Sequence, residues 1–222
     1  MTWTVDQQLA LSATQAVEAI HAGQLRAADY VATLLARAQA LSNLNALTVL
    51  DVEGALAAAQ RIDSLGANER ARLPLAGLPV VVKDNINTRG LQTSAATPAL
   101  EGFVPARHAP SVQRLVDAGA ILLGKANMHE LAFGITSTNL APHAGPVRNP
   151  WDPERIPGGS SGGTMRPITF PCGEKIHNPL GPATYTFPSV STFMPSSASL
   201  PRSFVRSAQS LPLVRSPFGC TS

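Results

Sequence analysis

Two short stretches hold the residues with the clearest capacity for chemistry. The first, at residues 78–85 (L-P-V-V-V-K-D-N), is an apolar, β-branched run that ends at Lys83. The ordinary interpretation of such a lysine is that it snorkels to solvent or pairs with Asp84. The functional interpretation is that burial lowers its pKa, so that a neutral amine is available as a base. Taken alone, this lysine favours the ordinary interpretation.

The second stretch is the glycine-flanked serine pair at residues 157–163 (P-G-G-S-S-G-G). A run of glycine and serine is often a flexible linker. Here the run is short and follows Asn149-Pro150-Trp151-Asp152-Pro153, which favours a shaped loop. Glycines on both sides permit close approach of the backbone to a ligand, and Ser160 and Ser161 supply hydroxyl groups.

Two other motifs lack essential parts. Residues 119–125 fit G-x-x-x-x-G-K, but Ala126 replaces the hydroxyl residue that binds magnesium in a phosphate-binding loop. His129-Glu130 begins H-E-x-x-H, but Phe133 occupies the position of the second histidine. The histidines and the two cysteines show no metal-ligand spacing, so we expect no metal site.

The length, composition and charge of the chain limit the class of protein to which it can belong. The chain has 222 residues, 44% of them hydrophobic, which allows one large domain or two small ones with a real core. A net charge of +3 without a basic block gives no reason to expect nucleic acid as a partner. The chain has no signal-peptide pattern at its start and no apolar run near the ~18 residues of a membrane span. With only Cys172 and Cys220, we expect a cytoplasmic protein without disulfides or membrane contact.

Hydrophobic periodicity predicts alternating helices and strands up to about residue 133. Expected helices cover residues 13–22 (capped by Ser12 and ended by Gly23), 27–40, 52–65, 111–118 and 127–133. Expected strands cover residues 46–50, 78–82 and 120–123. We expect surface loops at residues 66–73 and 85–97. This order predicts an α/β layered architecture.

The composition changes at about Thr164. Residues 165–222 are crowded with proline and serine, and Glu174 is their only acidic residue. Prolines interrupt every candidate element, so we expect an irregular or disordered tail. The predicted division is therefore 1–164 and 165–222. One hypothesis is a change of reading frame near Thr164; a splice or an evolved truncation would give a similar sequence.

Three motifs together resemble the amidase signature family. They lie at residues 77–85, 124–130 and 157–163, in the family's order and at its spacing, and the resemblance covers roughly residues 11–164. Residues 127–134 are most similar to the indoleacetamide and mandelamide hydrolase branch. The resemblance implies the N-terminal half of an α/β/α layered mixed sheet, followed here by the irregular tail.

The resemblance also implies roles for particular residues. In the family, neutral lysine takes a proton from a bridging serine that follows a cis peptide bond. The bridging serine in turn takes a proton from a nucleophilic serine, which forms an acyl-enzyme and releases ammonia. Lys83 and Ser160 match the base and the bridge. Asn127, Met128, Gly159 and Ser161 match substrate-binding positions. The family needs no cofactor, its partner is a small amide, and a full-length member is a possible homodimer.

One part of the family pattern is missing. The nucleophile lies about two dozen residues after the bridging serine, in a motif like D-T-G-G-S. Residues 178–185 here read N-P-L-G-P-A-T-Y. We therefore expect no amide turnover from the chain as written. Three alternatives stay open: an amidotransferase component that works on glutamyl-tRNA, an allophanate hydrolase, and a non-catalytic fragment.

Overall fold

The computed structural model describes residues 3–164. The predicted division at residue 164 and the expectations for residues 165–222 lie outside this part. The α-helices are α1 (Val5–Leu9), α2 (Ala13–His21), α3 (Ala27–Ala40), α4 (Val52–Ser64), α5 (Ala67–Ala71) and α6 (Pro110–Asp117). The strands are β1 (Leu47–Leu50), β2 (Pro79–Lys83) and β3 (Ile121–Ala126). Short 3₁₀ helices are η1 (Ser42–Leu44), η2 (Pro98–Leu100), η3 (Glu130–Ala132) and η4 (Gly162–Thr164).

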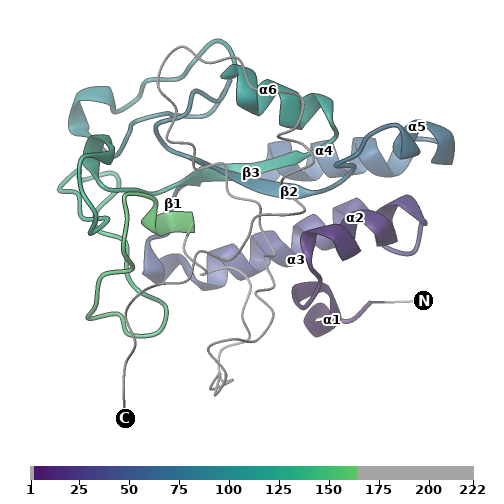
Figure 1. The fold of residues 1–222 in the computed structure, drawn as a ribbon, viewed down its shortest axis with the longest axis horizontal. Coiled ribbons are helices and arrows are strands. Elements are labelled where there is room, and N and C mark those ends of the chain that lie inside the picture. Colours follow the sequence, from purple (N-terminus) through teal and green to yellow (C-terminus); the bar gives the residue numbers. More distant parts are fainter. Residues whose placement is uncertain (1–2, 165–222) are drawn as a thin grey trace, which may run out of the picture. The chain divides into compact units, whose positions relative to one another are not determined.

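The three strands form one mixed sheet in the order β1-β3-β2 (Figure 1). β3 lies in the middle, antiparallel to β1 and parallel to β2. The parallel connection from β2 to β3 runs through α6, as a crossover requires. The register shifts between Val80 and Val81, where the partner changes from Leu122 to Gly124. A side chain at Gly124 would collide with the Val49 carbonyl, so glycine lets β1 and β3 approach at this point.

Helices cover both faces of this sheet, which explains why β2 is buried along its whole length. On one face, Val81, Ile121 and Leu123 pack with the apolar stripes of α3 and α4. On the other face, Val80 and Leu78 pack near Leu115 of α6. Alternation of side chains along a strand sends successive residues to opposite layers. The mixed α/β layer architecture expected from the sequence is therefore confirmed.

Local signals account for most of the helix boundaries. Ser12 caps α2 with a reciprocal pair of hydrogen bonds to Gln15, and Gly23 follows the helix at φ 68°. Asp51 caps α4 by accepting from the Gly54 N–H group at 3.0 Å. α3 has no side-chain cap of its own at Arg26. Instead, the Asp63 carboxylate of α4 accepts from the first N–H groups of α3, at 2.7 and 3.0 Å.

Two local predictions were wrong. Residues 66–73 were expected to form a loop but contain α5, a five-residue helix with no buried residue. Its Glu69 carboxylate accepts from the Gly66 N–H group at 3.1 Å, and a helix held by such a cap has no apolar stripe to reveal it. Residues 127–133 were expected to form a helix. Only η3 forms, because Leu131 and Ala132 adopt left-handed φ angles of 53° and 61°.

Two elements differ from expectation in extent. α1 at the start of the chain was not predicted; Thr4 caps it in a reciprocal pair with Gln7. β3 was expected to end at Leu123 but continues to Ala126, where its last residues still pair with Val82 and Lys83 of β2. None of the helices within residues 3–164 has the length and apolar character needed to cross a bilayer.

Candidate active site

Lys83 ends β2 and contacts the glycine-rich loop 77 residues further along the chain. Its Nζ donates to Ser160 Oγ at 2.7 Å. Only 6% of Lys83 is exposed, and this burial lowers the pKa of its amine from the usual 10.5. Desolvation disfavours the ammonium form, so the same contact can also carry a proton from the hydroxyl to the amine.

The loop that carries Ser160 is fixed by backbone hydrogen bonds to the end of β3. The Gly159–Ser160 peptide bond is cis, in agreement with the geometry that the family resemblance implies. The His129 N–H group donates to the Ser160 carbonyl at 2.9 Å, and the Gly163 N–H group donates to the Asn127 carbonyl at 2.9 Å. A side chain at Gly163 would lie 2.6 Å from the Asn127 backbone nitrogen. Glycine is therefore needed here for close packing of two backbone segments.

Ser137 joins the two ends of the loop at residues 157–163, called the serine loop below. Its Oγ donates to the Gly158 carbonyl at 2.6 Å and accepts from the Gly162 N–H group at 2.8 Å. Ser137 is fully buried and has a left-handed φ of 55°. Sequence reasoning missed this residue, because a single serine in a polar segment carries no periodic or motif signal. Its two hydrogen bonds connect Gly158 with Gly162, on either side of Ser160.

Asn127 is buried just after β3 and organises several loops. Its Nδ2 donates to the carbonyls of Asn45 (2.9 Å) and Gly145 (3.1 Å), and its Oδ1 accepts from the Met128 N–H group at 2.7 Å. Asn139 Nδ2 also donates to this Oδ1, at 3.2 Å. The carboxamide of Asn127 is thus engaged by the protein, and its predicted contact with substrate stays a prediction.

The other residues predicted to bind substrate differ in exposure. Met128 is fully buried, in a small cluster with Ala96, Ala141 and Ala144. Gly159 is exposed and Ser161 is half-buried, both on the loop beside Ser160. The structure therefore brings Lys83, Ser160, Gly159 and Ser161 to one place at the end of β2, while Met128 lies in the interior.

A second buried lysine lies nearby, and sequence reasoning did not select it. Lys125 Nζ lies 3.6 Å from Asp84 Oδ1 and donates to the Thr93 hydroxyl at 2.7 Å and to the Ile86 carbonyl at 2.8 Å. Burial lowers the pKa of Lys125 to about 8, although the Asp84 carboxylate opposes the shift. The hydroxyl of Ser94 donates to Asp84 Oδ2 at 2.5 Å. This network ties the segment after β2 to β3.

The geometry at Ser160 is that of a hydroxyl beside a desolvated amine. A neutral amine in contact with a serine hydroxyl is the arrangement that activates a nucleophile directly or relays a proton to another group. Among residues 3–164, no three histidine, cysteine, aspartate or glutamate side chains lie close enough to hold a metal ion. The chemistry supported by the Lys83–Ser160 pair is acyl transfer by proton abstraction from a hydroxyl.

Known proteins match the same part of the chain. The model of the family described as Amidase matches residues 29–165, more than half of the chain. A subunit of the glutamyl-tRNA(Gln) amidotransferase of Deinococcus deserti is 44% identical over 69% of this chain and 31% of its own length. An indoleacetamide hydrolase of Rhizobium radiobacter is 45% identical over 71% of this chain and 32% of its own length. The chain thus spans about a third of the length of the curated relatives that it matches.

Solved structures of amidases match a similar share of this chain. The native peptide amidase of Stenotrophomonas maltophilia is 35% identical, with a TM-score of 0.63 over 70% of this chain and 33% of that one. A fatty acid amide hydrolase is 23% identical, with a TM-score of 0.67, a likeness of fold alone. The family model, the relatives and the folds agree with the motifs at Lys83 and Ser160: this chain belongs to the amidase signature family and corresponds to its N-terminal portion.

Proposed function

We propose that this chain supplies the base and the bridging serine for hydrolysis of the C–N bond of a primary carboxamide. The observation that carries the proposal is the 2.7 Å contact between Lys83 Nζ and Ser160 Oγ, with the lysine almost fully buried. Neutral Lys83 takes the proton of Ser160, and Ser160 takes the proton of a second, nucleophilic hydroxyl, which attacks the amide carbonyl. Return of the proton to the leaving nitrogen releases ammonia, and water releases the acid.

The substrate that we favour is an arylacetamide such as indole-3-acetamide or mandelamide. The similarity of residues 127–134 to that branch and the 45% identity to an indoleacetamide hydrolase support this choice. The 44% identity to the amidotransferase protein supports a second candidate, in which the amide is glutamine and the ammonia is passed on to a glutamyl-tRNA. Both candidates use the same Lys83–Ser160 pair.

The nucleophilic hydroxyl is not among the residues that the structure describes. The family resemblance places it in residues 178–185, where no Gly-Gly-Ser stands. Residues 1–222 alone should therefore release no ammonia from indole-3-acetamide above the background of a Lys83→Ala variant.

A graft tests the proposal on the described part. Residues 1–164 replace the matching third of the Rhizobium indoleacetamide hydrolase, which keeps its own remaining sequence. We expect ammonia release from indole-3-acetamide, lost by about 100-fold or more in Lys83→Ala and in Ser160→Ala. The same graft into the Deinococcus amidotransferase protein, assayed for glutaminase activity in its complete complex, tests the second candidate. Folded grafts that are inactive on both amides would contradict the proposal.

A further inference from the structure

We propose that Ser160 is itself an acyl acceptor in this chain: Lys83 removes its proton, and Ser160 Oγ attacks the carbonyl carbon of an activated ester. This inference deepens the proposed function and rests on the same Lys83–Ser160 pair. It differs in requiring no second serine, because the bridge of the family relay becomes the nucleophile. A serine and a lysine alone can form such a nucleophilic pair.

The first support is the geometry of the pair. Lys83 Nζ and Ser160 Oγ are 2.7 Å apart, within the reach that a general base requires. Lys83 is 6% exposed, whereas Ser160 is half-buried and its neighbour Gly159 is exposed. The base is thus shielded from water, whereas the loop that carries the hydroxyl is partly exposed to solvent. Burial also lowers the pKa of Lys83, which increases the neutral fraction at a given pH.

The second support comes from three other buried hydroxyls near the site, which already donate hydrogen bonds to acceptors in the protein. Ser94 Oγ donates to Asp84 Oδ2, and Ser137 Oγ donates to the Gly158 carbonyl. Thr93 Oγ1 accepts from Lys125 and donates to the Leu91 carbonyl at 3.3 Å. Each of these hydroxyls faces an acceptor in the protein. Ser160 is the hydroxyl that faces the Lys83 amine.

The third support is a set of available backbone donors. Along the serine loop, the N–H groups of Gly162, Gly163 and Thr164 donate to Ser137 Oγ, the Asn127 carbonyl and the Ser161 carbonyl. Within the described part of the chain, the N–H groups of Ser160 and Ser161 have no such acceptor. The N–H group of the residue after a nucleophile is a common stabiliser of the oxyanion of an acyl-transfer intermediate. The Ser161 N–H group is placed in the chain to do this.

The charged groups around Lys83 do not compete for its amine. Asp84 follows it in sequence, but its carboxylate is engaged by Lys125 of β3 and by Ser94. His129, from the segment that holds the Ser160 carbonyl, has its Nδ1 at 3.1 Å from the Thr136 hydroxyl. The pH dependence of acylation should therefore report the loss of the Lys83 proton.

The probe is p-nitrophenyl acetate, an activated ester. The Ser160 Oγ–H bond breaks and its proton moves to Lys83 Nζ. A bond forms between Oγ and the acetyl carbon, and the bond from that carbon to the p-nitrophenolate oxygen breaks. The products are acetyl-Ser160, protonated Lys83 and p-nitrophenolate, and the net charge is unchanged.

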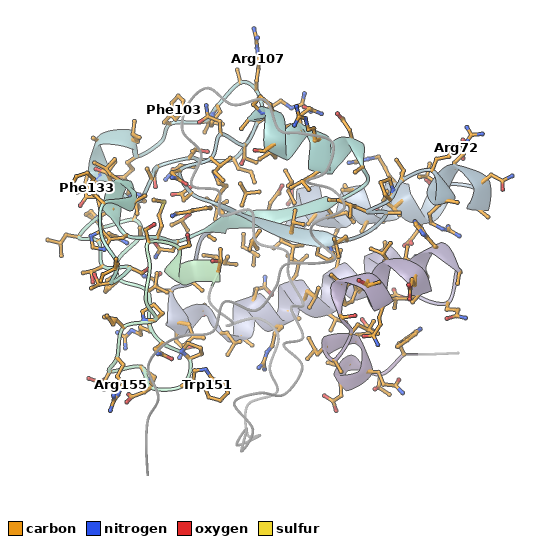
Figure 2. The ribbon with its side chains drawn as sticks, in the orientation of Figure 1. Arg72, Phe103, Arg107, Phe133, Trp151 and Arg155 are labelled. Atoms are coloured by element: carbon orange, nitrogen blue, oxygen red, sulfur yellow. The ribbon has the colours of Figure 1, made fainter. Side chains whose placement is uncertain are left out.

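The experiment measures the burst of p-nitrophenolate from the full chain, residues 1–222, and locates the acetyl group by tandem mass spectrometry. We expect one acetyl group on Ser160, which hydroxylamine removes because it is an ester. The burst rate should rise with pH to a plateau whose midpoint lies below 10.5, the usual value for lysine. It should fall by about 100-fold or more in Lys83→Met, which removes the amine and keeps an unbranched side chain only one atom shorter. Arg107→Ala, on an exposed surface arginine, is the matched control and should react normally (Figure 2).

Other outcomes overturn the inference. An acetyl group on Lys83 that resists hydroxylamine would show that the amine is the nucleophile. Acetylation of a different hydroxyl, or a burst on Ser160 with a midpoint at or above 10.5, would exclude the Ser160–Lys83 mechanism. The pH profile of the unaltered chain decides this even if Lys83→Met fails to fold. Failure of the amide graft together with acetylated Ser160 would refute only the proposed function, and an active graft without acetyl-Ser160 would refute only this inference.

Discussion

Lys83 and Lys125 lie one register position apart on neighbouring parallel strands, and their amines serve opposite faces of the sheet. Lys83 pairs with Ala126 and Val82 pairs with Lys125. Because neighbouring residues of a strand alternate between faces, Lys125 shares a face with Asp84, while Lys83 faces the serine loop. One buried lysine therefore lies beside a carboxylate, and the other donates to a hydroxyl. This difference suits Lys125 to structure and Lys83 to proton transfer.

The buried ion pair gives a first prediction for stability. Lys125→Met leaves the Asp84 carboxylate buried without its cation, so we expect a loss of about 3–5 kcal/mol in the free energy of unfolding. The double variant Lys125→Met/Asp84→Asn should lose less than the sum of the single variants, as measured by urea denaturation. The exposed Arg155–Asp152 pair is the control; Arg155→Met should cost less than about 1 kcal/mol (Figure 2). Additive losses for the buried pair would contradict the prediction.

The buried titrating groups give a prediction for pH. Burial lowers the pKa of Lys83, and lowers that of Lys125 to about 8, so above pH 8 the native state holds fewer protons than the unfolded chain, whose lysines titrate near 10.5. The free energy of unfolding should therefore rise from about pH 8 toward pH 10. Burial raises the pKa of Tyr30 above the usual 10.0, so its contribution is lost as pH rises beyond 10 and the curve should turn down.

Urea denaturation across this pH range checks that prediction. Lys125→Met removes the lysine whose pKa burial lowers to about 8 and should flatten the rise between about pH 8 and 10. A free energy of unfolding that falls throughout this window would show that the lysines remain charged in the native state.

The contact between Lys83 and Ser160 could be anticipated from sequence, whereas its support could not. A β-branched apolar run and a glycine-flanked serine pair are both local patterns, and the family resemblance joined them into one site. The role of Ser137 could not be predicted from the sequence. It depends on a left-handed backbone conformation and on the Gly158 carbonyl and the Gly162 N–H group, which only folding brings to its hydroxyl. The ion pair of Lys125 could not be predicted for a similar reason, since its partner Asp84 follows a different strand, β2.

The errors in secondary structure have the same origin. Residues 127–133 contain helix-forming residues, but Asn127 is held by carbonyls from distant loops, and the Leu131 N–H group donates to the Ala95 carbonyl at 2.9 Å. Tertiary hydrogen bonds therefore override the local preference for helix. Where apolar spacing decides, as in α3 and α4, the predicted and observed bounds differ by no more than a residue.

The two hydrogen bonds of Ser137 across the serine loop give a third prediction. Ser137→Ala removes the donor to Gly158 and the acceptor for Gly162, leaving two backbone groups without partners. We expect a loss of about 2–4 kcal/mol in the free energy of unfolding and faster hydrogen exchange at the Gly162 amide. Ser64→Ala, which removes one exposed hydrogen bond to the Arg61 carbonyl, is the control and should change little. Unchanged exchange at Gly162 would show that Ser137 does not hold the loop.

Close packing at Gly163 gives the last prediction. A methyl group there would overlap the Ala46 carbonyl and approach the backbone nitrogen and oxygen of Asn127 to 2.6 Å. These are backbone atoms at the end of β3 and in the segment before β1, so they cannot move without displacing the strands. Gly163→Ala should therefore abolish cooperative unfolding, or lower its free energy by about 3 kcal/mol or more, and should also prevent acylation of Ser160.

Gly66→Ala is the matched control, since the added methyl would find only Glu69 at 3.5 Å and the cap residue of α5 is exposed. We expect a change below about 1 kcal/mol for this variant. If the two alanine variants proved equally stable in thermal and urea denaturation, the contact between the serine loop and the end of β3 would not be the tight one seen here. The position of Ser160 relative to Lys83 would then have to be held by Ser137 and the His129 N–H group alone.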